Sequence, residues 1–181
     1  MEIGDEVARR VVAGDPHAFR EVYQALAPKV LGYLRARGVE DPEGLTSEVF
    51  LAVYPRLADL SGGAAGLRTL VFSVAHARAV DDVRRTARRP VNYSYDPQYD
   101  ERTIVSAEQE AVISLEAERA LEAMRHLNDD QRTVITLRII GDLSLQETAS
   151  VTGKTVASVK QLQRRGLLRL RTLMAPQEVG Q

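Results

Sequence analysis

The chain has 181 residues, no cysteine, and 24 lysines and arginines against 25 aspartates and glutamates. This length suits one larger domain or two small ones, at about 100–200 residues per domain. The absence of cysteine excludes disulfides and thiolate metal sites, and the sequence has no run of about 20 apolar residues that could span a bilayer.

The first 90 residues have the pattern of consecutive helices. Acids occupy the N-terminus where a signal peptide would be basic, so we expect a cytoplasmic protein without membrane insertion. Asp5 is the expected cap of a first helix. Asp15 and Asp41 are each followed by proline, a strong helix-start signal, and we expect Pro28 to kink or restart the helix after Asp15. A later helix has apolar residues at four-residue steps, which predict a core-facing stripe: Leu45, Val49, Val53 and Leu57.

A loop of small residues at 59–66 precedes a helix expected from about Leu67 to Arg88, with Ala77 on its core face. The C-terminal end of this helix is basic. Cations there suit the helix dipole, so the arginines have two interpretations, helix stabilisation and nucleic-acid binding.

Pro90 ends this helical part of the chain. Residues 91–113 contain three tyrosines, a proline and several acids without a helical period at their start, and we interpret them as an extended acidic linker. Further helices are expected at about 106–126 and 128–140, the second capped by Asn128. The tail at 176–181 is expected to fray.

The stretch from Leu143 to Arg171 has the pattern of a helix-turn-helix. Ser144 and Glu147 form a predicted capping box at the start of a short helix. Gly153 can adopt the positive φ of the turn, and Thr155 is placed to cap the second helix.

The second helix of this motif carries one strongly basic face, and no acid occurs between Glu147 and Glu178. A basic helix that also bears glutamine, serine and threonine can enter a DNA major groove, where it contacts phosphates and base edges. The simpler interpretation is a solvated amphipathic helix. The short helix, the glycine-containing turn and the long basic helix together favour DNA binding.

Enzyme chemistry has no visible basis in the sequence. It contains no phosphate-binding glycine loop and no nucleophile elbow. The three histidines are scattered, and the adjacent Asp81 and Asp82 cannot face each other on a helix. We therefore expect no catalytic residues, no metal and no cofactor.

Three stretches in order resemble the small extracytoplasmic-function (ECF) sigma factors of bacterial RNA polymerase. Residues 41–57 resemble the helix of region 2.2, residues 66–85 the helix of regions 2.3–2.4, and residues 123–171 region 4. The resemblance implies an all-α fold of two small helical domains joined by the linker. Residues 1–90 would be the region 2-like domain and residues 114–175 the region 4-like helix-turn-helix domain.

The resemblance also implies partners and site residues. The partners would be core RNA polymerase, through its clamp coiled coil and flap, promoter DNA, and an anti-sigma factor. Residues implied in docking on the polymerase clamp are Asp41, Glu43, Leu45, Glu48 and Phe50. Residues implied in holding the melted −10 element are Ser61, Gly62, His76, Arg78, Arg84, Arg85 and Arg88. Residues implied in reading the −35 element are Lys154, Thr155, Ser158, Lys160, Gln161, Arg164 and Arg165.

Two alternatives stay open. One is a stand-alone regulator that uses the helix-turn-helix without polymerase, which predicts binding to a palindromic site with half-sites about one turn apart. The other is a sigma-like protein that occupies polymerase without initiating transcription. The second alternative rests on Thr69 and His76, which replace a tryptophan and an asparagine usual in the family beside the strand-melting site.

Overall fold

The structure of the protein, a computed structural model, describes residues 3–87 and 119–175. The first range contains helices α1 (Asp5–Val12), α2 (Pro16–Arg37), α3 (Pro42–Val53) and α4 (Gly63–Ala87), with the 3₁₀ helix η1 (Tyr54–Asp59) before α4. The second range contains α6 (Asp129–Ile139), α7 (Leu145–Thr152) and α8 (Val156–Met174), and residues 119–125 are also helical. The described ranges contain no strand, so the predicted all-α class is confirmed. The linker at 91–113 and the tail at 176–181 lie outside the described residues.

The start signals in the N-terminal unit, residues 3–87, act as predicted for two helices. The Asp15 carboxylate accepts a hydrogen bond from the His17 N–H at 2.8 Å, and the Asp41 carboxylate accepts one from the Gly44 N–H at 2.9 Å. Helix α2 runs through Pro28, so the expected restart does not occur. Pro28 is exposed on the helix surface, where water can bind the carbonyl that loses its N–H partner.

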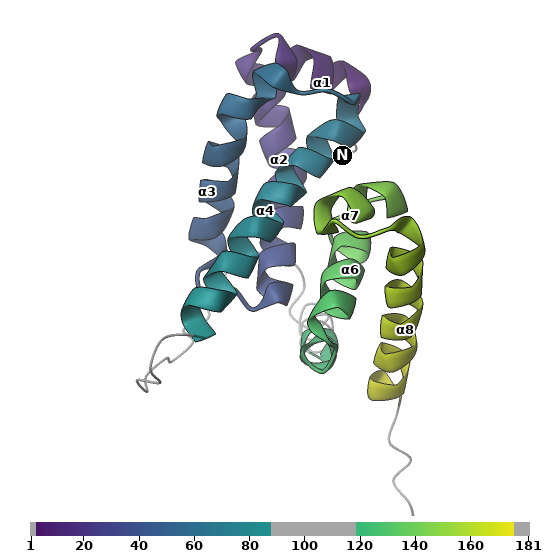
Figure 1. The fold of residues 1–181 in the computed structure, drawn as a ribbon. Helices are drawn as coiled ribbons and strands as arrows, with labels where there is room; N and C mark the ends of the chain where they lie inside the picture. The colour runs from purple at the N-terminus through teal and green to yellow at the C-terminus, as the bar shows by residue number, and fades with distance from the viewer. Residues whose placement is uncertain (1–2, 88–118, 176–181) are drawn as a thin grey trace, which may run out of the picture.

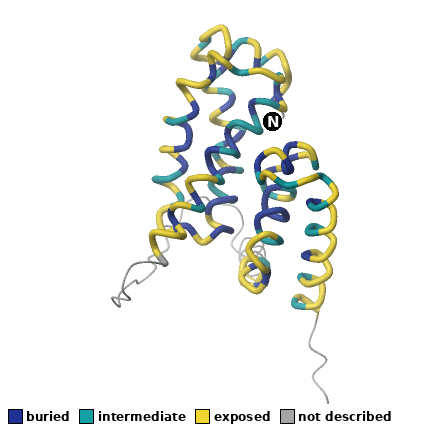
Figure 2. Tube along the Cα trace, in the orientation of Figure 1, coloured by how far each residue is buried: buried dark blue, intermediate teal, exposed yellow. Residues whose placement is uncertain are grey.

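The core of the N-terminal unit lies between α2, α3 and α4. The predicted stripe holds, because Val49, Val53 and Leu57 are buried and Leu45 packs against the same cluster. Tyr33 of α2 and Phe72 of α4 meet edge-to-face at its centre, with ring centroids 6.0 Å apart. Figure 2 shows buried segments, in dark blue, along the helices of this unit.

Three expectations about this unit are wrong. Asp5 does not cap α1, because Gly4 is at the N-cap position. Its carboxylate instead accepts the Ala64 N–H at 2.8 Å, which ties α1 to the first turn of α4. Helix α4 starts at Gly63, within the stretch expected to be a loop, and its winding buries Ala75 and Ala79 while Ala77 is exposed.

The C-terminal unit, residues 119–175, has the predicted caps. Asn128 accepts the Gln131 N–H at 2.9 Å at the start of α6. Ser144 and Glu147 form the full capping box of α7, with bonds of 3.1 and 2.7 Å. Gly153 takes φ 66° in the turn, and Thr155 accepts the Ser158 N–H at 3.2 Å at the start of α8. These contacts confirm the helix-turn-helix.

The two units lie against each other, with α7 packed on α4 and α6 on α2 (Figure 1). Leu137 and Leu143 of the C-terminal unit belong to the same buried cluster as the core of the N-terminal unit. The predicted domain limits at residues 90 and 114 fall between the described ranges, so they stay predictions.

Candidate nucleic-acid interface

Helix α8 presents an exposed basic face. The C-terminal unit holds it through a buried cluster of Val134, Ala149 and Val159, which come from α6, α7 and α8. The exposed polar residues of α8 include Lys160, Gln161, Arg164, Arg165, Arg169 and Arg171. Within the described residues none of these cations forms an ion pair with a carboxylate. Uncompensated positive charge on one face attracts a polyanion such as DNA.

The predicted −35 residues fall into two groups. Lys160 with Arg164 and Gln161 with Arg165 are four residues apart, so each pair lies on adjacent turns of one exposed surface. The other three residues lie at the start of α8 and have local roles. Thr155 is the N-cap and Ser158 is half-buried beside it, while the ammonium of Lys154 lies 3.0 Å from the Asp130 carboxylate. These assignments remain predictions.

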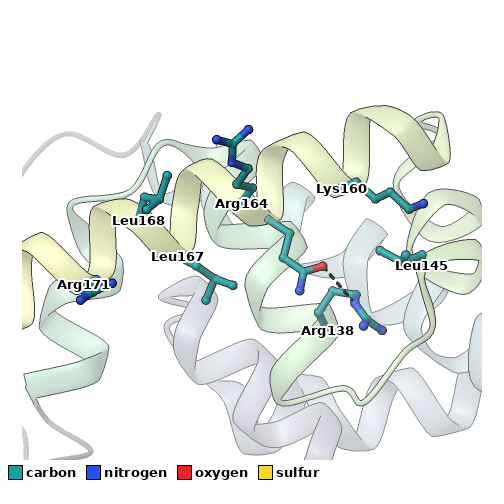
Figure 3. Close-up of a pocket in the computed structure, with 8 residues that line it drawn as sticks. Arg138, Leu145, Lys160, Arg164, Leu167, Leu168 and Arg171 are labelled. Atoms are coloured by element: carbon teal, nitrogen blue, oxygen red, sulfur yellow. Dashed lines mark hydrogen bonds between the residues drawn. The ribbon is translucent and has the colours of Figure 1, made fainter.

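A groove of about 570 Å³ runs beside this basic face. Its lining combines three leucines with a basic rim, and Figure 3 shows these side chains around it: Arg138, Leu145, Lys160, Arg164, Leu167, Leu168 and Arg171. Arg138 donates to the Gln163 side-chain oxygen at 3.3 Å and also to the Leu143 carbonyl. Leu167 and Leu168 are both substantially exposed at the groove.

The predicted −10 residues spread along the whole of α4. Ser61 and Gly62 are exposed just before its first turn, and Arg84 and Arg85 are exposed near its last. At 1.5 Å per residue, about 22 residues separate these ends by roughly 33 Å. The two groups therefore do not form one compact patch. Arg88 lies outside the described residues.

Two of these arginines are paired with acids. Arg85 lies 2.5 Å from the buried Asp82 carboxylate, and Arg78 lies 3.5 Å from Glu48 of α3. Asp82 is thus the ion-pair partner of Arg85 at this end of the helix. DNA binding by Arg78 or Arg85 would require each guanidinium to exchange or share its carboxylate.

His76 is the half-buried member of the −10 group. Its Nδ1 lies 2.8 Å from the hydroxyl of the buried Tyr33. Burial, followed by the positive charge of Arg37, lowers the pKa of His76 below its ordinary value. A cavity of about 260 Å³ between the two units is lined by His76, Arg84 and Lys154 among others. His76 is therefore covered in part by the C-terminal unit.

The predicted polymerase-docking residues of α3 differ in accessibility. Glu43 and Glu48 are exposed, and a hydrogen bond from Arg35 at 2.5 Å lowers the pKa of Glu43. Asp41 serves as the N-cap of α3. Leu45 is half-buried, and Phe50 is 3% exposed with its ring against Tyr23 at 4.8 Å.

Two exposed apolar residues beside these acids were not singled out from the sequence. Leu51 is 75% exposed on α3, and Tyr54 is exposed at the start of η1. The sequence contains a signal for Leu51, because this residue lies off the four-residue stripe of Leu45, Val49, Val53 and Leu57. This surface, defined by Glu43, Glu48, Leu51 and Tyr54, is called the α3 surface below.

Over the described residues, no helix combines the length and apolar character needed to cross a membrane. The same residues include no group of three or more histidine, aspartate or glutamate side chains arranged to hold a metal ion.

Comparisons with known proteins agree on one family. Residues 123–172 match the family described as Sigma-70, region 4. The ECF RNA polymerase sigma factor SigD of Mycobacterium bovis is 33% identical over 175 residues, which cover 92% of this chain and 82% of the relative. The ECF RNA polymerase sigma factor RpoE of Cereibacter sphaeroides is 29% identical, with coverage of 89% and 88%. The solved structure of CnrH in complex with the cytosolic domain of CnrY has a similar fold, with a TM-score of 0.68 at 20% identity, over 94% of this chain and 96% of that chain.

Proposed function

Because the chain belongs to the family of ECF RNA polymerase sigma factors, we propose that it binds core RNA polymerase, directs it to promoters and assists promoter melting. The observation that carries this proposal is the exposed basic face of α8 in a capped helix-turn-helix, whose cations have no carboxylate partner among the described residues. The relatives are named as sigma factors, which favours this function over a stand-alone regulator.

The −35 element is proposed to bind the basic face of α8. The two exposed rows, Lys160 with Arg164 and Gln161 with Arg165, can combine phosphate contacts with base-edge contacts in a major groove. The first turn of α8 would face the DNA backbone, because the N-terminal end of a helix favours an anion.

The −10 element is proposed to follow α4 from Ser61 and Gly62 to the arginines at its end. Single-stranded DNA needs a positive track for its phosphates and a site that accepts an unstacked base. The roughly 33 Å length of this helix suits an extended strand rather than a single pocket.

Core polymerase is proposed to dock on the α3 surface. Glu43 and Glu48 provide negative charge, and Leu51 and Tyr54 provide apolar area beside it. A surface of this kind would bind a partner that carries basic side chains beside an apolar strip. The partner proposed here is the clamp coiled coil of the polymerase. Contact with the polymerase flap is assigned to the C-terminal unit. An anti-sigma factor is a further proposed partner, and the protein is proposed to act in the cytoplasm.

The test is run-off transcription with purified core polymerase on genomic fragments, with and without the protein. New specific start sites are expected only when the protein is present, and their upstream sequences should share two elements. The matched control is the double variant Lys160→Ala/Arg164→Ala, which should lose the start sites while it still binds core polymerase. Binding to a palindromic site without polymerase, and no new start site, would establish the stand-alone regulator instead.

A further inference from the structure

The cavity that holds His76 has the lining of a small anion site. We propose that it binds free phosphate or the phosphate group of a small molecule, through donors that several elements of the fold bring together. The cavity measures about 260 Å³, and its polar lining includes Arg37 of α2, His76 and Arg84 of α4, Thr133 of α6 and Lys154 of the turn before α8. This site goes beyond the proposed function, which assigns no small-molecule ligand.

Arg37 provides a buried donor without a partner. Its side chain is 2% exposed, and its terminal nitrogen Nη1 lies 2.8 Å from the Asp129 carboxylate. The Nε atom is buried and has no hydrogen-bond partner among the residues that the structure describes. A buried N–H without an acceptor is unfavourable, and such groups are normally satisfied by protein, water or a bound ion. A ligand oxygen beside Arg37 would supply the missing acceptor.

His76 adds a second donor to the lining. The hydroxyl of the buried Tyr33 lies 2.8 Å from the Nδ1 of His76. Burial raises the pKa of Tyr33, so the hydroxyl keeps its proton and can donate it to Nδ1. Burial also lowers the pKa of His76, which favours the neutral ring. A neutral imidazole that accepts at Nδ1 carries its proton at Nε2, where it can donate to a ligand oxygen.

The charges around the cavity leave one cation uncompensated. The two acids that line it are already paired, Asp129 with Arg37 at 2.8 Å and Asp130 with Lys154 at 3.0 Å. Arg84 is exposed and, within the described residues, has no carboxylate partner. Guanidinium groups match the geometry of phosphate oxygens and bind them through charge-assisted hydrogen bonds. The free charge and the donors together favour an oxyanion over a cationic ligand.

The size of the cavity restricts the ligand to a small molecule. Sites for drug-sized ligands have volumes of about 300–1,000 Å³, so a cavity of about 260 Å³ suits a phosphate group with few further atoms. Thr133 is buried at the cavity, and its hydroxyl can donate to a ligand oxygen. Residues of both units line the cavity, which favours a small molecule over an extended DNA strand.

The first test is isothermal titration calorimetry of the full chain with inorganic phosphate and with glycerol phosphate, at an ionic strength kept constant with potassium chloride. Saturable binding of one ligand per chain is expected. Equal affinities would show that the phosphate group alone is recognised, and tighter binding of the ester would place its further atoms in the cavity as well.

Two variants locate the ligand. Arg84→Gln removes the unpaired guanidinium and should weaken the affinity by roughly 10- to 150-fold, as expected for one hydrogen bond to a charged group. Thr133→Val removes only a hydroxyl and should weaken the affinity several-fold while Tm does not fall. The matched control is Arg20→Gln, which removes an exposed arginine of α2 outside the cavity and should bind phosphate as the parent does.

The basic face of α8 is the competing site for an anion. Binding that is lost in Lys160→Ala/Arg164→Ala but kept in Arg84→Gln would assign phosphate to α8 and overturn the cavity site. The absence of saturable binding by either compound would leave the Nε–H of Arg37 to water and would also overturn it. Binding of a short single-stranded oligonucleotide through Arg84, without binding of either small phosphate, would assign this arginine to DNA alone.

The effect of the ligand on transcription rests on the proposed function. His76 and Arg84 are predicted at the −10 element, so phosphate should lower run-off transcription by the parent and should do so less in Thr133→Val. Transcription that does not respond to phosphate would overturn this competition but not the site. Because calorimetry needs neither polymerase nor DNA, phosphate binding without any transcription would reject the proposed function and keep the cavity site.

Discussion

The surface cations compared in the two units differ in whether they have a carboxylate partner. In the C-terminal unit, the cations of α8 are exposed and, within the described residues, have no carboxylate partner. In the N-terminal unit, Arg35, Arg78 and Arg85 are each paired with an acid of the same unit. Helix α8 is therefore ready to bind an anion, whereas two predicted −10 arginines must first change partners.

This difference suggests a division of work between the units. An unpaired basic helix supplies affinity for duplex DNA through phosphate contacts and counterion release. Paired arginines contribute less until their acids are engaged elsewhere. Glu48 pairs with Arg78 and also belongs to the α3 surface, so polymerase docking on Glu48 would release Arg78 for DNA.

The largest effect is expected from removing one cation of α8. Arg164→Ala should weaken promoter binding by the holoenzyme by roughly 5- to 150-fold, corresponding to about 1–3 kcal/mol for a base-contacting arginine. The salt dependence should also lose about one phosphate contact if Arg164 binds the backbone instead. Binding is measured by fluorescence anisotropy on a promoter mapped by run-off transcription. Arg169→Ala, further along the same helix, is the control, and an equal loss in that variant would show nonspecific attraction.

A smaller effect is expected on the α3 surface. Glu48→Lys should weaken the affinity for core polymerase by about tenfold, because a rim charge of the wrong sign opposes a basic partner. The unfolding free energy should change little, since exposed ion pairs contribute about 0–1 kcal/mol. Biolayer interferometry and urea unfolding measure the two quantities. Asp59→Lys makes the same charge change on η1, outside this surface, and a loss of affinity as large as that of Glu48→Lys would remove Glu48 from the docking site.

Local signals explain why the helix-turn-helix could be predicted almost completely. The Ser144–Glu147 box, Gly153 and Thr155 each act within four residues of their partners, so the sequence alone contains the interaction. The Asp5–Ala64 bond spans 59 positions, and no local pattern indicates it.

Phe50 was expected at the polymerase surface, but its aromatic contact with Tyr23 of α2 accounts for its burial. The surface between the units depends on pairs such as Arg68–Glu147, 79 positions apart. Helix ends are therefore predictable from local chemistry, while accessibility requires the tertiary arrangement.

The cap of α7 offers a third test, on the stability of the C-terminal unit. Ser144→Ala removes one half of the capping box and should lower the unfolding free energy by about 1 kcal/mol. For a chain of this size that corresponds to a fall in Tm of about 2–4 °C. Ser150→Ala, at an exposed position of the same helix, is the calorimetric control. Equal Tm values for the two variants would show that the box contributes nothing to the fold.

The smallest effect concerns the pH dependence of the contact between the two units, in which α7 packs on α4 and α6 on α2. Its key group is His76, whose pKa is lowered by burial and then by the charge of Arg37. The polar and charged groups that surround His76 or line its cavity come from α2, α4, α6 and the turn before α8: Tyr33, Arg37, Arg84, Asp129, Asp130 and Lys154.

Separation of the two units should return the pKa of His76 towards its ordinary value near about 6.5. The separated units then bind a proton more readily than the packed units, so the contact between the units is most stable above that pH and weakens as the pH falls below it. Asp129 and Glu147 have lowered pKa values, because Arg37 in one case and Ser144 with Arg68 in the other outweigh the opposing effect of burial. Their contribution is lost only in more acidic solution, below about pH 4.

Measurements between pH 7.5 and 5.5 therefore isolate His76. Because the chain has no cysteine, Arg56→Cys and Thr172→Cys allow one dye to be placed on each unit, and single-molecule energy transfer between the dyes reports their distance. This distance should lengthen as the pH falls through this window. His76→Asn keeps a hydrogen-bonding group near Tyr33 but cannot titrate, so its distance should not respond to pH over the same range. A response of equal size in His76→Asn would assign the effect to another group. A flat profile in the parent would mean that the packed units accept a protonated His76, in which case the acids Asp129 and Asp130 outweigh Arg37 and Lys154 at this cavity.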